Sequence, residues 1–114
     1  MINKIKEVNF LDNELRQSYL DLNKSGSLQP KLYHFITRAI DDLRRDSFSG
    51  RMVVKDLISK KIKNKYKLDF DNLWVYNLPN AWRLIYTITG TELKIVSIIL
   101  DWLSHKDYER LFGF

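Results

Sequence analysis

The segment NLWVYNLPNAWRLIYTITGTELKIVSIIL, residues 72–100, decides the fold of this chain. It holds three runs rich in aromatic and β-branched side chains, which is a composition typical of β-strands. The three runs span residues 72–78, 82–89 and 93–100. Pro79-Asn80 and Gly90-Thr91 separate them with short turn sequences. Strands spaced this closely predict an antiparallel meander of three strands.

Two helices are expected before this meander. In the first, apolar side chains recur at helical spacing after a capping residue, Asp12 or Asn13, and the turn at 25–27 ends it. In the second, Pro30 suits the first helical position and the pattern ends near Asp46. The apolar positions of this second helix have offsets of 3, 4, 7, 8 and 11, the strongest periodicity in the sequence, and they are Leu32, Phe35, Ile36, Ala39, Ile40 and Leu43.

Three further segments complete the expected fold. Residues 4–10 predict a short first strand, and residues 52–58 allow another. Ser104 is a suitable N-cap for a short C-terminal helix that ends near Phe112. We therefore expect a single domain over residues 1–114, of the α+β class. Its N-terminal two-helix hairpin would pack on a small antiparallel sheet, with a short C-terminal helix.

The composition excludes several classes of protein. The chain has no cysteine, so a disulfide framework and thiol chemistry are excluded. Residues 1–10 mix charged side chains with apolar ones and lack the apolar core of a signal peptide. The longest apolar run, residues 95–100, is far too short to span a bilayer. These features predict a soluble protein of the cytoplasm.

Positive charge is concentrated in the middle of the chain. The net charge is +5, but residues 31–67 hold eleven Lys and Arg against four Asp, a balance of +7. Such a patch attracts RNA or an acidic partner, and it also keeps a protein soluble. The residues that we expect to contact RNA are Arg51, Lys60, Lys61, Lys63, Lys65 and Lys67.

Metal and nucleotide chemistry have little support in the sequence. Only two histidines occur, His34 and His105, so no zinc spacing exists. Asp69 with Asp71 is a very weak magnesium signal, and Glu92 with Asp101 adds little. No glycine-rich phosphate loop is present. We therefore expect neither a metal nor a cofactor.

Cleavage of RNA without a metal needs a base, cations for the crowded phosphorane and an acid for the leaving oxygen. Arg83 is a candidate cation, because it interrupts a strand of large apolar residues and such an arginine suggests an open sheet face. Alternation places Arg83 on the same sheet face as Ile85 and Thr87. The opposite face, which should meet the two helices, carries Trp82, Leu84, Tyr86 and Ile88. The segment 105–108 adds His105 and Tyr108 as candidate acids or base-stacking groups.

The segment 82–86, Trp-Arg-Leu-Ile-Tyr, resembles the "aromatic-Arg-Leu-Val-Tyr" strand of RelE/ParE-superfamily toxins. As in that superfamily, a turn, a hydrophobic strand and a His-x-x-Tyr-like segment at 105–108 follow it. Residues 72–80 look like an archaeal-type branch of these toxins. The resemblance covers most of the chain and rests on the order and spacing of short motifs.

The resemblance implies the toxin of a type II toxin–antitoxin system. Such a toxin enters the ribosomal A site, cleaves mRNA there without a metal and so inhibits translation. It implies a partner too, a protein antitoxin that covers the basic face. By this resemblance Arg83 stabilises the transition state, while Tyr108 and His105 act on the leaving group or stack on a base.

One departure from the resemblance concerns the base. Toxins of the RelE type often carry lysines on the strand before the arginine strand, where this chain has Trp74 and Tyr76. The base would then come from Lys55 or Lys60, or the protein cleaves weakly or not at all. The ParE branch of the fold inhibits DNA gyrase instead, and an inactive basic RNA-binding member is a third reading.

Overall fold

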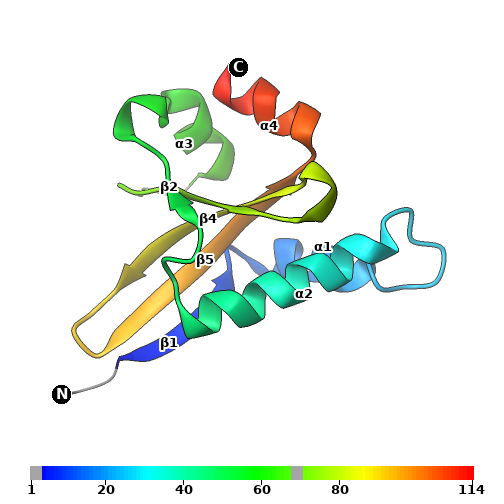
Figure 1. Cartoon of the computed structure of the whole chain (residues 1–114), viewed down its shortest axis with the longest axis horizontal. Helices are drawn as coiled ribbons and strands as arrows, with labels where there is room; N and C mark the ends of the chain where they lie inside the picture. The colour runs from blue at the N-terminus through cyan, green and yellow to red at the C-terminus, as the bar shows by residue number, and fades with distance from the viewer. Residues whose placement is uncertain (1–3, 68–70) are drawn as a thin grey trace.

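The computed structural model describes residues 4–67 and 71–114 and has the α+β architecture expected from the sequence (Figure 1). Asp69, half of the weak magnesium pair, lies outside these residues. The elements are β1 (Ile5–Phe10), α1 (Asn13–Asp21), α2 (Pro30–Arg45), β2 (Arg51–Met52), the 3-10 turn η1 (Lys55–Leu57), α3 (Lys60–Tyr66), β3 (Trp74–Asn77), the 3-10 turn η2 (Pro79–Ala81), β4 (Arg83–Gly90), β5 (Lys94–Leu103) and α4 (His105–Phe112).

One five-stranded sheet organises the molecule, with the order β1-β5-β4-β3-β2. The predicted meander is confirmed, because β3, β4 and β5 pair antiparallel in sequence order. The sheet is nevertheless mixed rather than purely antiparallel. β1 pairs parallel with β5, from Ile5 opposite Lys94 to Phe10 opposite Ile99, and the helices follow this strand instead of opening the chain. Sequence patterns predict strands, but they do not show which two strands will pair when the two are far apart along the chain.

Helices α1 and α2 run out and back along one face of the sheet (Figure 1). Leu84 and Tyr86 of β4 are fully buried against them, and Trp82 and Ile88 pack at the margin of the same core. The predicted alternation of β4 is therefore confirmed. The hydroxyl of Tyr86 donates to the carbonyl of Ser47 at 2.9 Å and accepts from the amide of Gly50 at 3.1 Å, which fixes the loop that leads into β2.

The other face of the sheet is covered by α3 and α4, which lie together on the side opposite α1 and α2 (Figure 1). Ile85 of β4 is fully buried there with Ile62 of α3, and Leu111 of α4 packs in the same core. The expectation of an open face around Arg83 is therefore wrong. Arg83 itself is only half-buried, at the margin of this second core.

Helix α3 was not expected from the sequence. Its many lysines make the segment look uniformly polar, but it contains two apolar residues four positions apart, Ile62 and Tyr66. This spacing places both on one face of the helix, and that face is buried. The Ser59 side chain caps it by accepting from the amide of Ile62 at 3.3 Å. Residues 52–58, where a strand was allowed, form only the end of β2 and the turn η1.

A β-bulge shapes the far end of β5. Ile85 lies opposite Asp101 and Tyr86 lies opposite Ile99, so Leu100 is the extra residue. Because of the extra residue, Leu100 and Asp101 both contact the α3 side of the sheet. No helix in the described residues is long and apolar enough to cross a membrane.

Candidate functional site

Arg83 begins β4, opposite Asn77 of β3 and Leu103 of β5. Its guanidinium carbon lies 5.4 Å from the centre of the Tyr108 ring, within the range of a cation–π contact. One terminal nitrogen donates to the carbonyl of Trp82 at 3.2 Å. The Nε atom is buried and has no hydrogen-bond partner among the residues that the structure describes. The guanidinium is thus held by the protein while much of its donor capacity is unused.

Tyr108 is buried on α4 and reaches back over the sheet. The Ser104 side chain caps this helix by accepting from the amide of Asp107 at 3.3 Å, as the sequence predicted. The Tyr108 hydroxyl lies 3.4 Å from a terminal nitrogen of Arg51 on β2. Three side chains from β2, β4 and α4 therefore meet, and we call Arg51, Arg83 and Tyr108 the Arg–Tyr cluster.

The Arg–Tyr cluster combines two permanent cations with one phenol. A guanidinium stays charged at any physiological pH and matches the oxygens of a phosphate with paired donors. A phenol can donate a proton to an oxygen, or it can stack on a base. The cluster is therefore equipped to bind a phosphodiester and to stabilise added negative charge on it.

An apolar groove adjoins the cluster and has a volume of about 290 Å³. Arg51 and Tyr108 form its polar end. The remaining wall is apolar and comes from β2, the segment up to η1 and the end of α4, with Met52, Val54, Leu57, Phe112 and Phe114 as its main residues. The groove could not be expected from the sequence, because its residues come from three separate segments, 51–57, 75 and 108–114.

The predicted RNA-contacting lysines lie on α3, next to α4. Lys60, Lys61, Lys63, Lys65 and Lys67 are all exposed. The Lys61 ammonium lies 3.5 Å from the carbonyl of Arg110, and a cleft of about 450 Å³ between the two helices is lined by Lys61, Lys65, Arg110 and Asp107. Helix α4 thus lies between a basic cleft and the Arg–Tyr cluster.

Two other predicted site residues lie apart from the cluster. His105 is exposed at the start of α4, and its ring pairs with Glu109 on the same helix. Lys55 is exposed on η1, one residue after the groove-lining Val54, but it does not line the groove itself. The structure therefore brings Arg83 and Tyr108 together with Arg51, and it does not bring His105 or Lys55 into the same contact.

Trp74 and Tyr76, which stand where lysines are common in the toxins resembled, face away from the cluster. Both pack on the core beneath α1 and α2. The Tyr76 hydroxyl donates to Asp42 on α2, and burial together with this bond raises the pKa of Tyr76 to about 12. On β3 it is Val75 and Asn77 that share the face of Arg83, and neither is a base.

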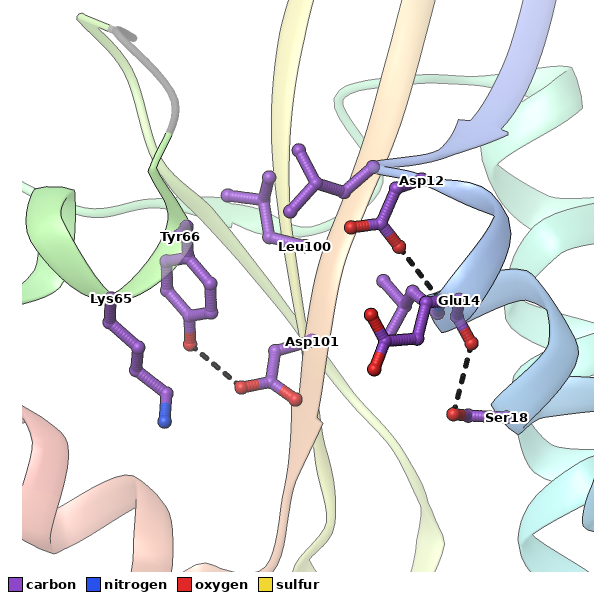
Figure 2. A pocket seen from close by; sticks show the side chains of 9 residues that line it. Asp12, Glu14, Ser18, Lys65, Tyr66, Leu100 and Asp101 are labelled. Atoms are coloured by element: carbon purple, nitrogen blue, oxygen red, sulfur yellow. Dashed lines mark hydrogen bonds between the residues drawn. The ribbon is translucent and has the colours of Figure 1, made fainter.

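A polar pocket that was not expected from the sequence lies between α1 and α3 (Figure 2). The Tyr66 hydroxyl donates to Asp101 at 3.0 Å on one side, and Asp12 and Glu14 approach from α1 on the other. Burial raises the pKa of Asp101, and it raises the pKa of Tyr66 too. In the described part of the chain no three His, Cys, Asp or Glu residues are grouped to hold a metal ion, so this pocket gives no reason to place one there.

Comparisons of the chain with family models, with curated proteins and with solved structures find no match. A proposal for its function therefore depends on the residues and on their arrangement.

Proposed function

We propose that this protein is a metal-independent endoribonuclease, the toxin of a type II toxin–antitoxin system that cleaves mRNA in the ribosomal A site and so inhibits translation. The observation that carries this proposal is the Arg–Tyr cluster. Its cations and its phenol come from β2, β4 and α4. All three residues were expected at a site from the sequence, Arg83 and Tyr108 for catalysis and Arg51 for contact with RNA. The proposal also draws on the resemblance to RelE/ParE toxins.

The order of elements supports the finer, RelE-like assignment of the fold. A first strand, a two-helix hairpin, an antiparallel run of strands and a C-terminal helix follow one another in the order on which the resemblance rests. The arginine strand is β4 in the middle of the sheet, and the C-terminal tyrosine folds back onto it.

The reaction that we propose is attack of a ribose 2′-oxygen on the adjacent phosphorus. A bond from this oxygen to phosphorus forms, the bond to the 5′-oxygen breaks, and a 2′,3′-cyclic phosphate results. Arg83 and Arg51 would stabilise the charge on the phosphorane, and the Tyr108 hydroxyl would give its proton to the leaving 5′-oxygen. Lys55 is our candidate acceptor for the 2′-hydroxyl proton, which it would take in its uncharged amine form; it lies one residue from the groove wall.

The basic cleft between α3 and α4 supports the choice of RNA as substrate. Lys61, Lys65 and Arg110 present cations next to the helix that carries Tyr108. A single strand that crosses the cluster would continue past them and gain phosphate contacts that do not depend on sequence. An acidic segment of a protein antitoxin would bind the same cations and block the strand.

The test is induced expression of the wild type, Arg83→Ala and Arg83→Lys, with growth curves and mapping of mRNA 5′ ends. Loss of one group that stabilises the transition state lowers a rate by roughly 10²–10³-fold, so Arg83→Ala should abolish growth arrest and the new ends together. Arg83→Lys should restore only part of the activity, because an ammonium lacks the paired donors. Arg16→Ala, an exposed arginine on α1, is the matched control.

Each outcome of this test decides between functions. New 5′ ends that are phased with codons, lost in Arg83→Ala, reduced in Arg83→Lys and unchanged in Arg16→Ala would support the proposal. Growth arrest without such ends would replace it with inhibition of a target such as DNA gyrase. A wild type that causes no arrest would identify an inactive RNA-binding protein of the same fold.

A further inference from the structure

Four large apolar side chains stand exposed around the groove beside the Arg–Tyr cluster. Met52, Val54 and Phe114 are 64%, 62% and 65% exposed, and Leu57 is also exposed. Single exposed apolar residues are ordinary, but a contiguous group that lines one hollow marks a binding surface. The groove therefore needs an occupant with an apolar surface.

The aromatic rings of the groove are arranged for stacking. The rings of Phe112 and Phe114 lie 5.8 Å apart at an angle of 15°, and Tyr108 packs against Phe112 with ring centres 4.9 Å apart. Phe114 is the outermost of the three, with most of its surface open. A flat ligand that binds on this surface would extend an existing stack.

The polar end of the groove restricts the occupant further. Arg51 lines the groove and also lies 3.4 Å from the Tyr108 hydroxyl, so a permanent cation joins the groove to the cluster. A nucleotide has this same pattern of a flat apolar base next to a charged phosphate. The volume of about 290 Å³ is at the lower limit for small-molecule sites and suits one base rather than a folded partner.

We infer that this groove binds one unpaired nucleobase of the RNA strand, next to the phosphate held by Arg51 and Arg83. The base would stack on Phe114 and be enclosed by Met52, Val54 and Leu57. This inference rests on the proposed function for its ligand. It adds to that function the residues that would set a base preference at the cut site.

The first test is binding of a short single-stranded oligouridine and of the same strand with one abasic position. Removal of one base–aromatic stack weakens the binding of a single strand by roughly 5- to 150-fold. Phe114→Ala should therefore weaken binding of the intact strand by roughly tenfold and leave binding of the abasic strand unchanged. Phe114→Trp should retain the discrimination. Leu93→Ala, an equally exposed apolar residue in the β4–β5 turn, is the control.

The results separate this inference from the proposed function. If the wild type binds the intact and the abasic strand equally, or if Phe114→Ala weakens both equally, the groove does not hold a base. Displacement of the strand by an amphipathic leucine–glutamate peptide, with no discrimination against the abasic strand, would make the occupant a protein segment and overturn the inference. If Phe114→Ala changes the bases found at the cut sites while Arg83→Ala still cleaves, the inference about the groove is supported and the proposed catalytic role of Arg83 is wrong.

Discussion

Asp101 carries a carboxyl group that burial holds above its usual pKa, although Tyr66 and the amide of Trp102 both donate to it. Since the folded pKa exceeds the unfolded value, the native state binds this proton more tightly. The contribution of Asp101 to stability is then fully present below its ordinary pKa of 3.8 and is lost as the pH rises through the folded pKa.

Asp101→Asn should therefore raise the free energy of unfolding at neutral pH, because the amide keeps an acceptor for Tyr66 without a buried charge. In acid, where the wild-type carboxyl is protonated, the difference between the two proteins should vanish. Urea unfolding of both proteins, from acid to neutral pH, measures the difference between their free energies of unfolding. Asp56→Asn, at an exposed position on η1, is the control. A gain that persists unchanged in acid would mean that the carboxylate charge is not its cause.

Single residues were predictable from the sequence where their chemistry conflicts with their surroundings. Arg83 was identified because it interrupts an apolar strand, and Tyr108 because a phenol close to the C-terminus can donate a proton or stack on a base. Arg51 was expected only as one cation among several, since nothing local indicates that it reaches a hydroxyl 57 residues further along. The pair of Tyr66 and Asp101 was missed for the same reason.

At the level of elements, the cap of α4 matters because Tyr108 lies one turn after it. Ser104→Ala removes the acceptor for the amide of Asp107 and should lower the free energy of unfolding by about 1 kcal/mol. It should also reduce the proposed RNA cleavage, since the first turn of α4 would fray at the tyrosine. Thermal unfolding and a cleavage assay on the same preparation measure both effects.

The cap of α3 offers a matched control for this prediction. Ser59→Ala removes an equivalent acceptor, from the amide of Ile62, on a helix that does not carry the tyrosine. It should lower stability by a similar amount, about 1 kcal/mol, and leave the cleavage step of bound RNA intact. Equal losses of cleavage in the two variants would show that global stability, rather than the position of Tyr108, sets the activity.

Elements with a strong periodic or alternating pattern were predicted well, and those without one were not. The second helix and the three-strand meander follow directly from their side-chain patterns. Helix α3 was missed because its four exposed lysines outweigh its two buried residues in any average over the segment. The parallel partner of β1 was missed because pairing over such a distance depends on how the whole chain packs.

For the whole molecule, the uneven charge predicts a steep dependence of RNA binding on salt. Each phosphate contact on a single strand contributes about 0.7 to the slope of log K against log salt. The double variant Lys61→Gln/Lys65→Gln in the α3–α4 cleft should therefore reduce the slope by up to about 1.4. Titrations of oligouridine at several salt concentrations measure it.

A control variant with the same change of net charge separates the effect of the α3–α4 cleft from the effect of net charge alone. Lys4 and Lys31 are exposed, one just before β1 and the other at the start of α2, away from α3 and α4 (Figure 1). Lys4→Gln/Lys31→Gln should leave the slope nearly unchanged. Identical slopes in the two double variants would mean that RNA binding depends on the net charge of the protein and that the cleft has no special role.

The parallel pairing of β1 with β5 has a consequence for the order of synthesis. β1 is made early, but its strand partner is β5, from Lys94 opposite Ile5 to Ile99 opposite Phe10, and β5 is the last strand of the described residues to be translated. Because such long-range pairing must wait for both segments, the sheet cannot close co-translationally before β5 has emerged. In a nascent chain β1 would thus stay without its strand partner, with Val8 and Phe10 open to chaperones, until almost all of the described domain has been translated.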